Sequence, residues 1–166
     1  VTSAETTARP GGHELEISYV GAPIKNEQGQ VIGALEFVTD LTAVKKAGRV
    51  AAKVAQFQAA EAARLTDSLG KLAQGDLNCS IHMGTCDEDT AAAHKTFAQI
   101  AAALNSCIEA INGLIGESAT LAAAAADGRL DTRANDGQFQ GKYREIIQGL
   151  NGTLEGFATP IRDIAF

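Results

Sequence analysis

Side chains that commonly carry chemistry are few in this chain, and their spacing matches no reactive motif. The three histidines, His13, His82 and His94, lack the spacing of a metal-ligand set, so we expect them to face solvent or to form local hydrogen bonds. The three cysteines include no Cys-x-x-Cys pair, which favours a reducing compartment over a disulfide framework. No nucleophile–base pair, paired carboxylates or glycine-rich phosphate loop occurs in a convincing context. We therefore expect no catalytic residue, no bound cofactor and no metal site.

The composition favours narrow helix-on-helix packing. Of the 166 residues, 5% are aromatic and none is tryptophan, so few large side chains are present to fill a broad core. A net charge of −6 argues against nucleic acid as a partner, because neutralising phosphates requires clustered lysine and arginine. We find no signal peptide and no apolar run approaching the ~20 residues of a membrane span, so we expect any membrane anchor to lie outside this segment. Val1 in place of an initiator methionine suggests a fragment of a longer protein.

One pattern occurs twice. A short segment built on a glycine and two apolar residues returns after 53 residues: Gly75, Leu77 and Ile81 first, then Gly128, Leu130 and Ala134. Apolar helical runs precede and follow both copies, so the repeating unit is a helix, a non-helical connector and a second helix. Carrying the same interval into the downstream helices pairs further apolar residues: Phe97 with Leu150, Leu104 with Phe157, Ile108 with Ile161 and Ile111 with Ile164.

The connector residues have a physical role in this unit. Gly75 and Gly128 are predicted to end their helices at positive φ, where glycine is the least strained residue. The two apolar residues that follow are expected to pack into the helices and to hold an extended connector against them. A connector of about a dozen residues at ~3.3 Å each can return along a helix, so that both helices point the same way. In the second unit Ala134 is a weak anchor unless Phe139 or Tyr143 compensates.

Apolar residues along the helices are spaced for coiled-coil packing. In the last helix they recur at intervals of 3, 4, 3, 4 and 3 residues, at Ile147, Leu150, Leu154, Phe157, Ile161 and Ile164. The seam of the middle helix drifts, which is typical of a stutter, and Glu61 weakens the stripe of the first helix. One chain has too little apolar surface to enclose these seams, so we predict a mainly α fold of parallel homodimeric four-helix bundles. The run Ala122–Ala126 is either a strong helix former or a thin bundle layer that rearranges cheaply.

The chain before about Thr42 is β-rich. Alternating apolar residues from Glu14 to Val20 and an apolar run from Val31 to Val38 predict two strands. The intervening segment Asn26–Gln30, which contains Gly29, has turn chemistry. Because an isolated hairpin is marginally stable in water, we expect this one to belong to a larger sheet that the sequence does not contain.

The segments Gly12–Glu16 and Gly33–Thr42 resemble the last two strands of a PAS sensor domain. They end in Asp40-Leu41-Thr42, which is similar to the Asp-x-Thr exit motif of that family. The resemblance implies that residues 1–43 are the C-terminal part of a PAS sensor domain and that residues 44–52 form a linker helix. A complete PAS pocket can hold haem, flavin or a metabolite, but the part that lines it is mostly absent here.

The helices beyond resemble tandem HAMP domains of the kind found in methyl-accepting chemotaxis receptors. Gly75, Leu77 and Ile81 fit the HAMP connector pattern fully. Asp87-Glu88 resembles the acidic pair that opens the second helix of that family, and this pair either favours the helix dipole or stabilises one state of a switch. In the second repeat Gln140-Gly141-Lys142-Tyr143 replaces the acidic pair, so the start of its second helix stays open. The resemblance assigns residues 53–110 to a first HAMP domain and 107–166 to a second, with a shared or continuous helix.

The resemblance implies a signal relay. The runs Gly128–Ala134 and Gly149–Leu154 look like chemoreceptor sequence, so we expect the cytoplasmic segment of a bacterial chemoreceptor, with an inner-membrane receptor as one candidate parent. It is expected to pass conformational change from the PAS sensor to a kinase-controlling tip. Its expected partners are a second copy of the chain and, through a missing C-terminal region, a histidine kinase and adaptor. Alternative readings are the same relay in a sensor histidine kinase or cyclase, or a structural dimerisation stalk.

Overall fold

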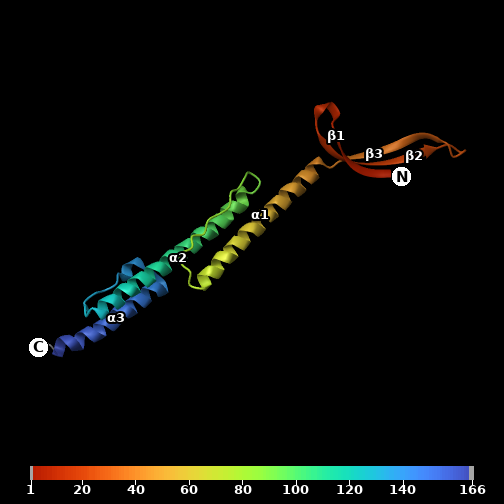
Figure 1. Ribbon diagram of the computed structural model, residues 1–166. Coiled ribbons are helices and arrows are strands. Elements are labelled where there is room, and N and C mark those ends of the chain that lie inside the picture. The colour runs from red at the N-terminus through yellow and green to blue at the C-terminus, as the bar shows by residue number, and fades with distance from the viewer. Residues whose placement is uncertain (1, 165–166) are drawn as a thin grey trace. The chain divides into compact units, whose positions relative to one another are not determined.

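The computed structural model describes residues 2–164, with side chains up to Pro160 (Figure 1). The chain divides into two compact units. The first contains the residues up to Ala60 together with Cys86–Ala93, and the second contains Glu61–Thr85 together with the residues from His94 onward. The predicted seam positions Ile161 and Ile164 lie outside the residues whose side chains are described.

An antiparallel sheet lies in the first unit. Its strands are β1 (Thr2–Ala8), β2 (Leu15–Lys25) and β3 (Val31–Asp40), hydrogen-bonded in that order. The predicted hairpin is confirmed as β2 and β3. Asn26 closes its turn, because the Asn26 side-chain oxygen accepts hydrogen bonds from the amides of Gln28 and Gln30. The expectation that the rest of the sheet lies outside this sequence is wrong for one strand, since β1 pairs with β2 from Thr2 to Ala8.

Strand β1 escaped the sequence pattern for a physical reason. It reads Thr-Ser-Ala-Glu-Thr-Thr-Ala, with no large apolar side chain, and its residues from Thr2 to Thr7 are all exposed. Such a strand lacks the alternation of apolar and polar residues that marks a half-buried strand. Its threonines suit a pleated edge, but that preference is too weak to identify a strand on its own.

Strand β3 carries apolar side chains that nothing among the described residues covers. Val31, Ile32, Leu35 and Phe37 are each 64–69% exposed, although consecutive residues of a strand point to opposite faces. Both faces of β3 are therefore open along most of its length. This agrees with the expectation that the hairpin belongs to a larger sheet.

The described helices are α1 (Thr42–Ala73), α2 (Ala91–Ala126) and α3 (Gly141–Ile164), with short 3-10 turns at Pro10–Gly12 and Asp136–Gln138. Two of these helices end in the same way. Gly75 follows α1 at φ +82° and Gly128 follows α2 at φ +72°, as predicted. In both places the glycine amide and the next amide bond back to helix carbonyls, which is the Schellman arrangement.

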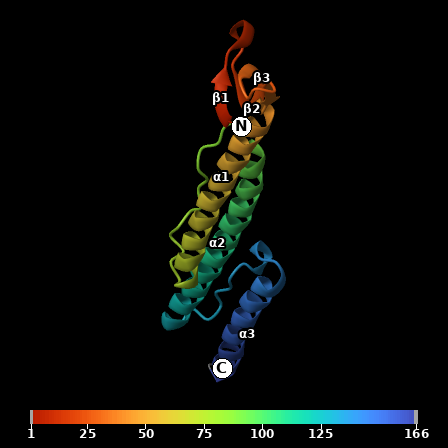
Figure 2. The ribbon, with the colours of Figure 1, turned by 90° about the vertical axis from the view of Figure 1, so that its right-hand side faces the viewer.

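The second unit contains two apolar clusters, each built from a helix, a connector and the next helix. The first cluster contains Leu65 of α1, Ile81 of the connector, and Ala101 and Ile108 of α2. The second contains five buried residues: Leu121, Ala134, Phe139, Ile147 and Leu154. The continuous helix α2 serves both clusters. Figure 2 shows the connectors returning beside the helices, so that successive helices of this unit run in the same direction.

The sequence was expected to contain no apolar run approaching the length of a membrane span, and helix α2 corrects this expectation. By length and composition alone it is apolar enough to cross a membrane. This is weak evidence for a membrane span, because a bundle helix of a soluble protein passes the same test. Asn105 and Asn112 of α2 form hydrogen bonds with the backbone of the first connector.

Candidate functional site

The first connector is fixed to α2 by an asparagine. The Asn105 side-chain oxygen accepts a hydrogen bond from the Ile81 amide at 2.9 Å, and its side-chain NH₂ donates to the Ile81 carbonyl at 3.1 Å. The Ile81 side chain itself is 6% exposed. Two turns further along α2, the Asn112 side chain donates a hydrogen bond to the carbonyl of half-buried Leu77 at 3.3 Å. The backbone of an extended segment is thus satisfied by helix side chains in place of a strand.

The second connector repeats this geometry. Asn151 of α3 accepts from the Ala134 amide and donates to the Ala134 carbonyl, both at 2.9 Å. Ala134 is 6% exposed, and Leu130 is half-buried against the same cluster. Of the two aromatic residues that could compensate for the small Ala134, Phe139 is buried and Tyr143 is exposed. Phe139 therefore supplies the volume that Ala134 lacks.

These two asparagine clamps show that the downstream helices of the two units align at a different sequence interval from the connectors. Asn151 follows Asn105 by 46 residues, whereas the connectors repeat after 53. At the interval of 46 the burial also matches, since Ala101 and Ile147 are both buried and so are Ile108 and Leu154. The pairing of Phe97 with Leu150 and Leu104 with Phe157 is therefore wrong by one heptad. A coiled-coil seam repeats every seven residues, so apolar periodicity alone could not reveal the shift.

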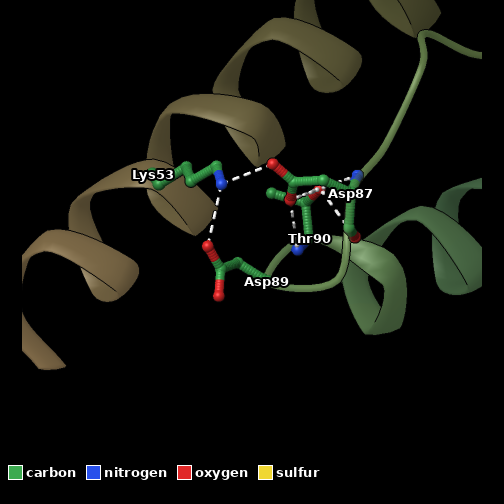
Figure 3. Close-up of polar contacts among 4 residues, drawn as sticks. All are labelled: Lys53, Asp87, Asp89 and Thr90. Atoms are coloured by element: carbon green, nitrogen blue, oxygen red, sulfur yellow. Dashed lines mark hydrogen bonds and ion pairs between the residues drawn. The ribbon is translucent and has the colours of Figure 1, made fainter. Parts of the chain in front are cut away.

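An acidic turn precedes α2 (Figure 3). The Thr90 amide donates to Asp87 Oδ1 at 3.2 Å, and the Asp87 amide donates to Thr90 Oγ1 at 3.0 Å, which is a reciprocal capping arrangement. The Lys53 ammonium of α1 contacts Asp87 and lies 2.8 Å from Asp89 Oδ2. Of the predicted pair Asp87 and Glu88, Asp87 thus makes contacts in the turn before α2, and Asp89 makes the second contact with Lys53; all three residues are exposed.

These contacts stabilise the charged forms. Hydrogen bonds from Lys53 and then Thr90 lower the pKa of Asp87, and the two aspartates raise the pKa of Lys53. The arrangement is an ion pair shared between one face of α1 and the turn before α2.

The second unit uses a different acidic residue before its last helix. Asp136, in the 3-10 turn before α3, accepts hydrogen bonds from Arg144 Nε at 2.9 Å and from Gln148 Nε2 at 2.7 Å. Arg144, followed by Gln148, lowers the pKa of Asp136. Helix α3 begins at Gly141, which answers the question that the sequence left open about its start. The spacing between Asp136 and Arg144 is the sequence feature that could have predicted this contact. The turn between the two residues, however, has a shape that the sequence did not predict.

The exit from the sheet is held by Asp40 and Thr42. The Thr42 amide donates to Asp40 Oδ1 at 2.8 Å, and Thr42 lowers the pKa of Asp40. The Thr42 hydroxyl oxygen accepts from the Glu16 amide at 2.9 Å. The two motif residues therefore join the end of β3, the beginning of α1 and strand β2.

Glu61 is a buried carboxylate that sequence reasoning treated only as a defect in an apolar stripe. It is 2% exposed, and its Oε1 accepts a hydrogen bond from the Gly84 amide at 3.2 Å. A Cβ on Gly84 would lie 2.5 Å from that oxygen, so the close approach requires glycine or a displaced carboxylate. Glu61 is thus a third attachment of the first connector.

Among the described residues, no group of histidine, cysteine, aspartate or glutamate could hold a metal ion. The three cysteines are free thiols. An open, mainly apolar groove of about 560 Å³ lies in the second unit, and Leu121, Leu130, Leu150 and Phe157 are among the residues lining it. Phe157, one of the predicted seam residues, is 61% exposed there.

Comparison with protein families gives a match to the HAMP domain at residues 138–165, which contain α3. The match supports a HAMP-containing signalling protein, and HAMP domains relay signals within sensor proteins. No curated protein and no solved structure matches the chain.

Proposed function

From the HAMP match at residues 138–165, we propose that this chain is the signal-relay segment of a bacterial chemoreceptor, carrying two HAMP units in tandem. The units are residues 53–110 and 107–166, and the relay acts on a histidine kinase and adaptor through regions outside this segment. The observation that carries the tandem assignment is the repeated clamp, in which Asn105 and Asn151 hold Ile81 and Ala134 in the same way.

The relay works as a parallel homodimer. The support is the apolar groove beside α2 and α3, together with Phe157, which a helix of a second copy would cover. Sedimentation equilibrium at micromolar concentration is expected to show a dimer. A well-folded monomer under those conditions would overturn this part of the proposal.

The upstream input comes from a PAS sensor, of which residues 1–43 are the last part. The support is the sheet with its open β3 and the bonds of Asp40 and Thr42 at the start of α1. Amide exchange in β3 should be fast in this chain and should slow when the preceding segment of the parent is present. Equal, strong protection in both would mean that the sheet finds its cover elsewhere.

Receptor output tests the relay itself. In the full-length parent, Asn105→Ala is expected to change kinase activity and its response to stimulus. The reason is that the released first connector no longer favours one of two alternative helix packings over the other. Lys71→Met, at an exposed ion pair within α1, is the matched control and should leave output unchanged. If Asn105→Ala loosens the connector and output stays normal, the segment is a structural stalk.

A further inference from the structure

Three cations on α1 lie on one face of the helix. Lys45, Arg49 and Lys53 are spaced by four residues, so their side chains project from the same side in successive turns. Each of them pairs with an acidic residue of another segment. Lys45 lies 2.6 Å from a Glu5 oxygen of β1, and Arg49 Nη1 lies 2.9 Å from both carboxylate oxygens of Glu16 in β2.

The third cation, Lys53, pairs with the acidic turn before α2. It contacts Asp87 and lies 2.8 Å from Asp89. Figure 3 shows Lys53 reaching from α1 to both carboxylates. The cation face thus connects two strands at one end with the start of a different helix at the other. All of these residues belong to the first compact unit.

We propose that Lys45, Arg49 and Lys53 form an electrostatic ladder through which the sheet acts directly on the N-terminal end of α2, in addition to the covalent route through Asp40 and Thr42 into α1. Its role in signalling rests on the proposed relay function. The sheet then acts on two helices, on α1 through the covalent chain and on α2 through charge.

Asp87 makes the ladder able to affect helix structure. Its Oδ1 accepts from Thr90, while its Oδ2 contacts Lys53, so one carboxylate serves the helix cap and the ladder together. A cap depends on the geometry of a single side chain. Withdrawing Lys53 therefore releases a restraint on the cap itself and not only on the surface of α2.

The partners of the ladder distinguish it from ordinary surface pairs. Arg49 and Glu16 are 33 residues apart in sequence, and Lys53 and Asp89 are 36 apart. Two other exposed pairs, Arg9 with Glu14 and Lys71 with Asp67, are local and join residues within five positions of each other. Only the long-range pairs carry a movement from one element to another. Their side chains are partly exposed, so the ladder biases a population and does not lock it.

Residue-resolved amide exchange in the whole chain tests the ladder at its far end. Glu16→Gln removes the charge in β2, and the readout is exchange at Thr90 and the first two turns of α2. We expect a three- to tenfold faster exchange there at low ionic strength. Asp89→Asn, which leaves the Asp87–Thr90 cap intact, should give a similar increase. Glu14→Gln is the matched control and should have no effect, because Glu14 pairs with Arg9 and not with α1.

Salt provides a second arm of the same experiment. Raising the ionic strength should speed exchange at α2 in the native chain and add little in Glu16→Gln, since screening removes the same attraction. Unchanged exchange at α2 in both Glu16→Gln and Asp89→Asn would overturn the ladder. If exchange changes but kinase output of the full-length receptor does not, the ladder stands and the relay function falls.

Discussion

Asn105→Ala removes the side chain that clamps the first connector. In the native chain this side chain forms bonds of 2.9 and 3.1 Å with the amide and carbonyl of Ile81, a residue that is 6% exposed. Alanine can replace neither bond. Both backbone groups then lie beside apolar neighbours with no partner on α2.

The cost follows from those two groups. Leaving a buried donor or acceptor unsatisfied costs about 1–3 kcal/mol. Partial access of water to the connector reduces the sum, so we expect Asn105→Ala to lower the free energy of unfolding by about 2–4 kcal/mol. Asn151→Ala should cost a similar amount, because Asn151 makes the same pair of bonds at Ala134.

Urea denaturation followed by circular dichroism, at one fixed protein concentration, measures this cost. Asn112→Ala is the control, because Asn112 makes a single 3.3 Å bond to the Leu77 carbonyl at an exposed position. Its expected cost is below about 1 kcal/mol. A cost for Asn105→Ala no greater than that for Asn112→Ala would refute the clamp. Faster exchange of the Ile81 amide in Asn105→Ala should accompany the loss of stability.

Three further predictions concern the connectors and the acidic turns. Ile81→Ala should cost about 2–5 kcal/mol in urea denaturation, as a large-to-small change in a packed site, whereas Ala134→Gly should cost clearly less; equal costs would contradict the packing difference between the units. Gly128→Ala forces a side chain into φ +72° and should lower stability by about 1–2 kcal/mol, and a neutral result would show that the connector can rebuild its turn. The pKa values of Asp87 and Asp136 are lowered in the folded chain, so their contribution is present above the ordinary value of about 3.9 and is lost as pH falls below it. The urea midpoint should therefore drop on acidification through that range, and the drop should be smaller in Asp136→Asn.

The sequence was sufficient for features that depend on local chemistry. Positive φ at Gly75 and Gly128 follows from helix termination, and the turn at Asn26–Gln30 follows from its residue types. The packing of Ile81 and Ala134 into the clusters follows from an apolar residue placed in a polar connector. Each of these depends on a few neighbouring residues.

Features that depend on long-range pairing could not be found in this way. Strand β1 has no apolar pattern and is identified only by its partner β2. Glu61 reads as a polar interruption until Gly84 is known to approach it. The clamp residue Asn105 was hidden because an asparagine in a helix has many possible partners. The one-heptad shift of Asn151 was hidden because the shifted and unshifted seams have the same spacing.

That shift shows that two properties of a connector differ: how far along the helix it is clamped, and which side of the helix it contacts. Seven residues advance a helix by about 10.5 Å, yet they rotate it to within about 20° of two complete turns. An insertion or deletion of seven helical residues between Ile81 and Asn105 would therefore still place the asparagine on the side of the helix that faces the connector. An insertion of three or four residues would present it elsewhere on the helix. The two units of this chain differ by seven residues between the clamped connector residue and the asparagine, and in both units the asparagine still closes the connector.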